Sequence, residues 1–159
     1  MMHKTVLLDT SFFLKFLNDD DPLFKNADRY FRYFIQNNIG MMISTISIAE
    51  YCVGGDIHEL PLKNIQILPF NLEHGKRTGE FAKIVFSHKN TLQLNSRSII
   101  PNDTKLFAQA DIESSIQYYL SSDAESFKIY TLLKSHTKPA FQFINLAVPF
   151  SEVFGVLDL

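Results

Sequence analysis

Three acidic side chains lie where predicted elements of the chain begin or end, and a fourth lies within a predicted helix. Asp9 directly follows a short apolar run, and Asp123 follows another one later in the chain. Asp103 lies at the start of a predicted helix, whereas Glu50 lies about a turn and a half into a different helix. Ligands of open parallel sheets bind beyond the carboxyl ends of the strands. Such a topology could therefore bring all four acids to one edge of a sheet.

A cluster of carboxylates needs a compensating charge, because like charges that lie close together raise one another's pKa. A divalent cation offers this compensation, and all-oxygen ligation by carboxylates and water suits Mg²⁺ or Mn²⁺. Nothing near the four acids supplies the Cys and His set that zinc requires. Ions held in this way can activate water and stabilise the leaving oxygen in phosphodiester hydrolysis.

Each of the four acids also has a purely structural interpretation. Asp9, or one of the two hydroxyl residues after it, could cap the following helix. Asp103, in a first helical turn, gains from the helix macrodipole without any metal. Ser122 and Glu125 have the spacing of a capping box, which would make the acid between them incidental. Glu50 could be an exposed helical glutamate. Both sets of interpretations stay open at this stage.

Short apolar strands alternate with helices along the chain. The predicted strands are 4–8, 41–45, 64–70, 118–122 and 141–149. The predicted helices are 11–18, 19–38, 46–53, 71–88, 102–117, 124–134 and 151–157, with Asp21 as an N-cap and Pro22 at the first helical position of the second one. A polar loop is expected over 89–101. This alternation requires crossover connections and predicts an α/β fold: a three-layer α/β/α sandwich with a central, mainly parallel sheet, formed by residues 1–159 as a single domain.

The composition is ordinary for a soluble globular protein, with 46% apolar and 20% charged residues. Fifteen Lys plus Arg against seventeen Asp plus Glu give a net charge of −2, so a nucleic-acid site would have to be local. The single Cys52 excludes an intrachain disulfide. Asp9 and Lys15 interrupt the apolar N-terminal stretch, and no run has the length that crosses a bilayer. We expect a cytoplasmic protein with no membrane partner.

Four motifs occur in order along the chain. An aspartate lies in LLDTSFFLKFL, a glutamate in ISTISIAEY, a third acid in RSIIPNDTKLFAQA, and a serine, an acid and a phenylalanine in YYLSSDAESF. Together they resemble the PIN-domain family of metal-dependent ribonucleases, especially the compact toxins of bacterial VapC-type toxin–antitoxin pairs. The likeness is clearest from Lys4 to Phe127.

The resemblance implies a function and a set of site residues. The acids that it implies as metal ligands are Asp9, Glu50, Asp103 and Asp123. Thr10 and Ser121 would provide hydroxyl support for these carboxylates or for an ordered water. The implied activity is endonucleolytic cleavage of RNA with Mg²⁺ or Mn²⁺. Toxins of the family pair with small antitoxin proteins and often form homodimers, so both kinds of partner are implied. Whether the chain is a toxin or a processing enzyme stays open.

The chain departs from the family pattern in two motifs. In the third motif, Phe107 and Gln109 stand where small and aliphatic residues are usual, which bears on the packing under Asp103. In the fourth motif, Ser121 stands where Thr is more usual and Glu125 where Asp is common. The changes in the fourth motif keep the chemical type.

Two other functions are weighed against the ribonuclease. A PIN-like module that binds RNA or a protein without cleaving would accord with the altered third motif, although the four acids argue against it. A phosphatase of the haloacid dehalogenase type also begins with a strand-end aspartate. That chemistry needs a second aspartate two residues further on, where this chain has Ser11.

Other acids and the histidines are expected to lie outside the site. Asp111 lies eight residues after Asp103, which is about 12 Å along a helix axis and too far for one shared ion. Glu113 is farther still, and both are expected to be surface charges. The five histidines lack ligand spacing and are assigned no role.

Overall fold

Short runs of apolar side chains form a five-stranded sheet in the computed structural model, which describes residues 3–88 and 101–156. The strands are β1 (Thr5–Leu8), β2 (Gly40–Ser44), β3 (Ile65–Leu68), β4 (Ile116–Ser121) and β5 (Gln142–Asn145). Their order is β3-β2-β1-β4-β5, and all neighbouring strands are parallel. The central strand β1 is buried along its whole length. The carboxyl ends of all these strands therefore lie at one edge of the sheet.

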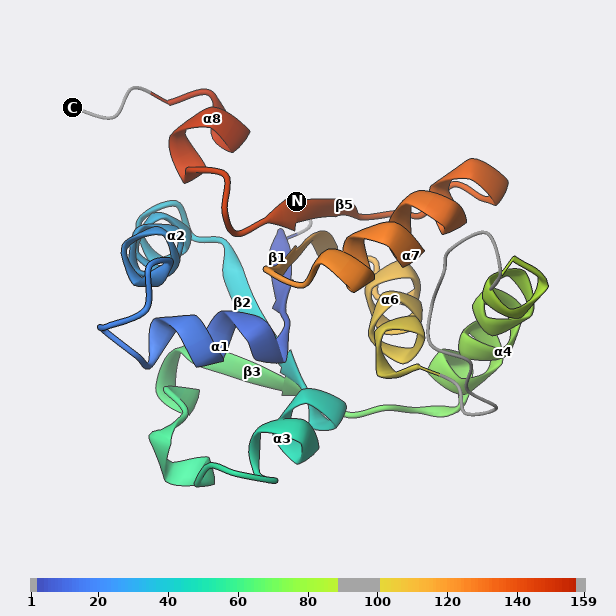
Figure 1. Ribbon diagram of the computed structural model, residues 1–159, viewed down its shortest axis with the longest axis horizontal. Coiled ribbons are helices and arrows are strands. Elements are labelled where there is room, and N and C mark those ends of the chain that lie inside the picture. Colours follow the sequence, from blue (N-terminus) through green and yellow to red (C-terminus); the bar gives the residue numbers. More distant parts are fainter. Residues whose placement is uncertain (1–2, 89–100, 157–159) are drawn as a thin grey trace.

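Helices cover both faces of this sheet (Figure 1). In the described residues they are α1 (Thr10–Phe16), α2 (Phe24–Gln36), α3 (Thr45–Tyr51), α4 (Leu72–Ser87), α6 (Asn102–Ile112), α7 (Ala124–His136) and α8 (Phe150–Phe154), with 3₁₀ turns at Ile57–Glu59 and Leu62–Asn64. On one face α2 packs against α1 and α8, and on the other α4 packs against α6 and α7. The expected three-layer α/β/α sandwich with a parallel central sheet is confirmed.

Alternating side chains of β1 pack into two separate hydrophobic cores. Val6 and Leu8 belong to the core beneath α1 and α2, whereas Leu7 belongs to the core beneath α4, α6 and α7. This alternation follows from the two-residue period of a strand. Because both faces are covered, β1 reads in the sequence as a continuous apolar run.

Several predicted element boundaries were wrong. The strand expected over 141–149 ends at Asn145, and the helix expected over 151–157 ends at Phe154. The helix expected from the start of the segment 19–38 begins only at Phe24, because Asp21 forms a turn: its carboxylate accepts from the Leu23 amide at 2.8 Å and pairs with Lys15 at 3.2 Å. The helix expected over 102–117 ends at Ile112, and Ile116 already begins β4. The predicted loop at 89–101 lies almost wholly outside the described residues.

Membrane insertion was not expected from the sequence. Among the helices that the structure describes, none combines the length and the apolar character that crossing a bilayer requires.

Candidate active site

The centre of the site is Asp9, at the end of β1. The register pairs Leu7 with Tyr119 and Leu8 with Leu120, so Asp9 and Ser121 are neighbours just beyond the paired residues. The Ser121 hydroxyl donates to Asp9 Oδ2 at 2.8 Å, and the Asp9 amide donates to the Leu120 carbonyl at 3.1 Å. Asp9 is only 5% exposed. The sheet itself therefore fixes this carboxylate at its edge.

Asp9 occupies the N-cap position of α1, yet its side chain makes no capping hydrogen bond. Its Oδ2 atom instead accepts a second hydroxyl hydrogen bond, from Ser11 at 2.8 Å. Burial raises the pKa of Asp9, hydrogen bonds from Ser121, Ser11 and the Thr10 backbone lower it in part, and the negative charge of Asp123 raises it further. A buried carboxylate with a raised pKa at a strand end is typical of functional sites rather than of helix caps.

Thr10 connects Asp9 to the second acid. Its hydroxyl donates to Glu50 Oε1 at 3.0 Å and so ties the start of α1 to α3. The N-terminus of α3 is capped by Ser44, whose Oγ accepts from the Ile46 amide at 3.0 Å. Glu50 is exposed and lies within α3, so it takes no part in this cap.

Asp123 lies just beyond the end of β4. Its amide donates to the Ser121 hydroxyl at 3.0 Å, and its Oδ1 accepts from the Glu125 amide at 2.9 Å, which makes Asp123 the N-cap of α7. The capping box weighed for Ser122 and Glu125 is thus replaced by a cap from the acid between them. Asp123 is exposed, and its electrostatic effect on Asp9 places the two carboxylates in one neighbourhood.

Asp103 brings the fourth segment to the same place. It lies in the first turn of α6 and is half-buried. Burial raises the pKa of Asp103 to about 7, and the charge of Asp9 raises it next, while the Ser126 side chain lowers it in part. The charges of Asp123 and Glu50 contribute in the same upward direction. The structure therefore brings all four acids that the sequence singled out into one another's electrostatic field.

The fit of a metal ion depends on the donors and on their spacing. Within residues 3–88 and 101–156, no three Asp, Glu, His or Cys side chains stand close enough together in this conformation to hold an ion. The donor chemistry nevertheless fits Mg²⁺ or Mn²⁺, because the cluster offers carboxylate oxygens. Two buried hydroxyls that act on these acids, those of Tyr119 and Ser126, form no hydrogen bond of standard geometry within the described residues. Unpaired buried groups of this kind are expected beside an ion or ordered water.

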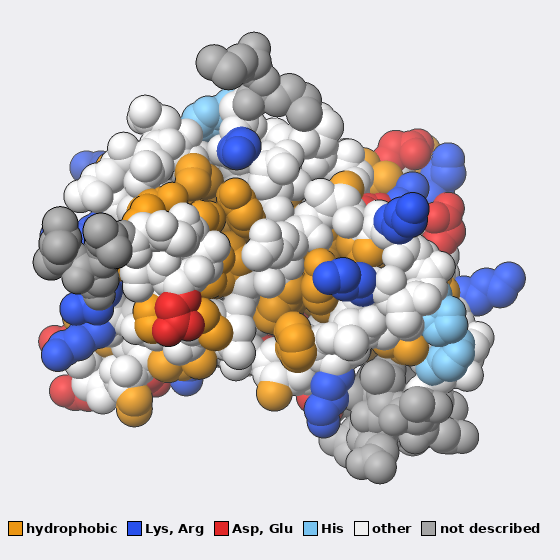
Figure 2. Space-filling model, turned by 90° about the horizontal axis from the view of Figure 1, so that it is seen from above, with side chains coloured by type: hydrophobic (Ala, Val, Ile, Leu, Met, Phe, Trp, Pro, Cys, Tyr) orange, Lys and Arg blue, Asp and Glu red, His pale blue; other side chains and the backbone are white. Residues whose placement is uncertain are grey.

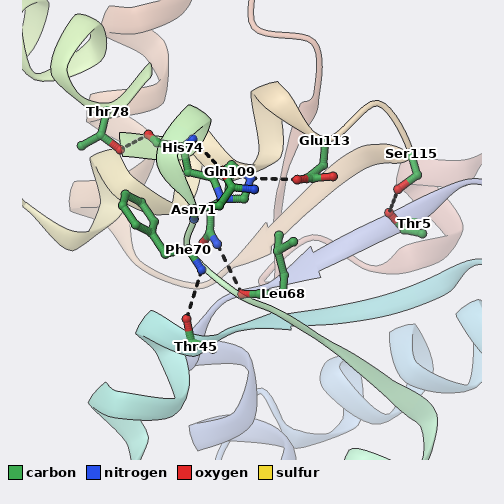
Figure 3. Close-up of polar contacts among 10 residues, drawn as sticks. All are labelled: Thr5, Thr45, Leu68, Phe70, Asn71, His74, Thr78, Gln109, Glu113 and Ser115. Carbon is green, nitrogen blue, oxygen red and sulfur yellow. Dashed lines mark hydrogen bonds and ion pairs between the residues drawn. The ribbon is translucent and has the colours of Figure 1, made fainter. Parts of the chain in front are cut away.

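Phe107 and Gln109, which depart from the family pattern, anchor α6 under Asp103. Phe107 is fully buried, and its ring contacts those of Tyr119 at 4.9 Å and Phe141 at 5.7 Å between centroids. Gln109 is also buried, and its Nε2 donates to the Leu68 carbonyl at the end of β3 at 3.4 Å (Figure 3). The two unusual residues therefore fill the core and join α6 to the sheet.

Two acids expected as surface charges instead join α6 to its neighbours. Asp111 pairs with Arg77 of α4, and its Oδ1 accepts from the Ala140 amide at 2.7 Å. Glu113 contacts the fully buried His74 at 2.8 Å (Figure 3). Because His74 Nδ1 accepts from the Asn71 amide, its proton lies on Nε2 and is donated to Glu113. These contacts hold α4 and α6 together and correct the surface assignment.

Three residues of the neighbourhood were missed by the sequence reasoning. Ser11 was considered as a helix cap, whereas its hydroxyl donates to Asp9 and its oxygen accepts from the Ser122 amide at 3.0 Å. Tyr119 and Ser126 were not singled out. The position of Tyr119, two residues before Ser121, was the available signal, because alternate residues of a strand share one face.

Comparison with known proteins identifies the fold. No protein-family model matches the sequence, and no curated protein sequence matches it either. Among solved structures, a chain from VapBC2 of Rickettsia felis, bound to a promoter DNA fragment, is similar with a TM-score of 0.58 and 18% identity over 89% of this chain and 98% of that one. A chain from DNA-bound VapBC of Salmonella typhimurium gives 0.57 and 14% over 90% and 98%.

A third similar structure is the toxin VapC20 of Mycobacterium tuberculosis, described as cleaving the sarcin–ricin loop. It has a TM-score of 0.51 and 16% identity, covering 77% of this chain and 92% of that one. At these identities the likeness establishes the fold alone. The chain has a PIN-like, VapC-type fold.

Proposed function

We propose that the chain is a divalent-metal-dependent endoribonuclease that hydrolyses RNA phosphodiester bonds. The observation that carries the proposal is the convergence of four acids from separate segments: burial raises the pKa of Asp103 to about 7, together with the charges of Asp9, Asp123 and Glu50. A fold that collects four acids from four separate segments, and tolerates their repulsion, needs a cation to compensate them. The repulsion among the acids destabilises the folded protein, as is typical of functional sites.

Each side chain has a part in this proposal. Asp9, Glu50, Asp103 and Asp123 would hold Mg²⁺ or Mn²⁺. When bound, the ion supplies positive charge that activates water and stabilises the departing oxygen. Ser11 and Ser121 hold Asp9 in a single orientation through their hydroxyls.

Thr10 and Asp123 complete these roles. The Thr10 hydroxyl orients Glu50 toward the sheet edge. Asp123 is held by its hydrogen bonds to the Ser121 hydroxyl and to the first turn of α7. Burial raises the pKa of Asp103 to about 7, so this carboxyl gives up its proton when the cation binds.

RNA is the proposed substrate, and a small antitoxin protein and a second copy of the chain are the proposed partners in the cytoplasm. On the face shown in Figure 2, lysine and arginine side chains are scattered rather than gathered in one patch, in keeping with the net charge of −2. We therefore propose that local contacts and the cation position the RNA, rather than a broad basic surface. The similar VapBC structures support an antitoxin partner.

The test is an RNA cleavage assay on a pool of structured RNAs with Mg²⁺, with Mn²⁺ and with EDTA. The matched variants are Asp9→Asn and, as a control, Glu73→Gln, which removes an exposed acid in the first turn of α4. We expect discrete metal-dependent fragments from the parent and from Glu73→Gln, and none from Asp9→Asn. Cleavage that persists in EDTA, or an active Asp9→Asn variant, would contradict the proposal.

One observation favours a second function, that of a PIN-like module which binds RNA or a protein without cleaving it. In this conformation, no three ligating side chains of the described residues are close enough to hold an ion. A binding module would retard RNA in a gel without producing fragments in Mg²⁺. The same assay therefore separates the two functions.

A further inference from the structure

Tyr119 carries a buried hydroxyl that the core does not need. The residue is fully buried in β4, where its ring packs against Phe107 at 4.9 Å and Phe143 at 5.6 Å between centroids. Within the part of the chain that the structure describes, its hydroxyl forms no hydrogen bond of standard geometry. A phenylalanine would keep the ring contacts and avoid the unpaired hydroxyl, since burying an unpaired polar group is unfavourable. The hydroxyl therefore calls for a reason other than packing.

The sheet places this hydroxyl beside the acids. Leu7 pairs with Tyr119 across β1 and β4, and alternate residues of a strand share a face, so Asp9 and Ser121 follow on that same face. Phe107, which the Tyr119 ring contacts, lies one helical turn after Asp103. The charges of Asp9, Asp103 and Glu50 all act on the Tyr119 phenol. Tyr119 therefore lies on the same face of the sheet as Asp9 and Ser121, within the electrostatic field of the acids.

We infer that Tyr119 is a positioning residue, whose phenol hydroxyl donates a hydrogen bond to the Asp9 carboxylate and so holds it for the divalent cation. The inference rests on the proposed function. In the conformation described, hydrogen bonding with Asp9 already contributes to the raised pKa of the phenol, which burial raises most, although no bond of standard geometry forms within the described residues. We expect this bond to reach full strength when the ion is bound. Asp9 is then fully ionised, and a hydrogen bond to an ionised acceptor is stronger than one between neutral groups.

The strand offers a matched pair of variants. Tyr119→Phe removes only the buried hydroxyl. Tyr118→Phe removes a hydroxyl from the adjacent residue, which is half-buried on the opposite face against Phe154. Each is made in the full chain and compared with the parent by Mn²⁺ titration and by thermal melting in EDTA.

We expect Tyr119→Phe to weaken Mn²⁺ binding roughly tenfold, as the loss of one hydrogen bond to a charged group predicts. Its melting temperature in EDTA should equal or exceed that of the parent, because an unpaired hydroxyl is gone. Tyr118→Phe should bind Mn²⁺ as the parent does. A merely structural role would instead lower the melting temperature of Tyr119→Phe and leave its Mn²⁺ affinity unchanged, which would overturn the inference.

The same titration distinguishes a failure of the inference about Tyr119 from a failure of the proposed function. If the parent binds no Mn²⁺, the proposed function fails and the inference falls with it. If the parent binds and cleaves, and Tyr119→Phe matches it in affinity, only the inference fails.

A second measurement needs no variant. In the parent labelled with ¹³C at tyrosine Cζ, Mg²⁺ should shift the Tyr119 resonance, which reports on its hydroxyl, and leave that of Tyr118 in place. A Tyr119 resonance unmoved by saturating Mg²⁺ would also overturn the inference.

Discussion

Replacing Asp103 by asparagine should stabilise the protein when no metal is present. The pKa of Asp103 is raised from 3.8 to about 7 in the folded protein by burial and by the charges of Asp9, Asp123 and Glu50. Between these values the folded state binds more protons than the unfolded state, so stability falls as the pH rises. The contribution of the protonated Asp103 carboxyl to the free energy of unfolding is fully present below about pH 4 and is lost as the pH rises through about 7. Asparagine has no ionisable proton, so it stays neutral over this whole pH range.

The size of the effect follows from the shift. A rise from 3.8 to about 7 corresponds to at most about 4 kcal/mol at pH values above 7. Solvent screening at the half-buried Asp103 reduces this to about 2 kcal/mol. Losing a negative charge from the first turn of α6 costs about 0.5 kcal/mol. The net gain in the free energy of unfolding should be about 1–2 kcal/mol near pH 8 and close to zero near pH 4.

The assay is chemical denaturation in EDTA at about pH 8 and about pH 4, with the free energy of unfolding taken from each transition. Glu73→Gln is the matched control, because Glu73 also lies in a first helical turn but is exposed. It should change stability by less than about 0.5 kcal/mol at either pH value. An Asp103→Asn variant that is less stable than the parent near pH 8, or whose effect does not depend on pH, would refute the reasoning.

Three further predictions concern the ion, the hydroxyl support and the core. Asp103 must lose its proton to bind a cation, so Mn²⁺ should raise the melting temperature more at about pH 8 than at about pH 6. Equal shifts of the melting temperature at the two pH values would argue against Asp103 as a ligand. Ser121→Ala removes the donor to Asp9 and the acceptor of the Asp123 amide. The free energy of unfolding in denaturant should fall by about 1–2 kcal/mol, and RNA cleavage should slow about 10–100-fold. Unchanged cleavage would exclude the supporting role of Ser121. Phe107→Ala should cost about 3–5 kcal/mol in the same denaturation assay, and a loss below about 1 kcal/mol would mean that the packing of α6 does not depend on this ring.

The strands and the order of the acids could be predicted because their signals are local. The buried run of β1 and the turn to Asp9 are visible within a few residues of sequence. The partners of Asp9 are not, because Ser121 lies 112 residues away and meets Asp9 only through the register of β1 with β4. Tyr119 was overlooked for the same reason, because its unpaired hydroxyl can be recognised only once α6 is packed against β4.

The errors also have physical causes. Asp21 and the following proline carry the signal of a helix start, yet the Asp21 carboxylate pairs with Lys15 and closes a turn before Phe24. Asp111 and Glu113 look like solvated helix charges, whereas tertiary contacts bring Arg77 and His74 of α4 to them. Long-range polar contacts of this kind leave no periodic trace in the sequence.

The most direct test of the account compares stability and RNA cleavage in one variant. The initial cleavage rate in Mg²⁺ of one RNA chosen from the pool is measured for the parent and for Asp103→Asn, each also melted in EDTA. We expect cleavage to fall about a hundredfold while the melting temperature near pH 8 stays the same or rises. A variant that cuts within about twofold of the parent rate, or that loses cleavage only because it unfolds, would contradict the claim that the four acids form a metal-dependent catalytic site.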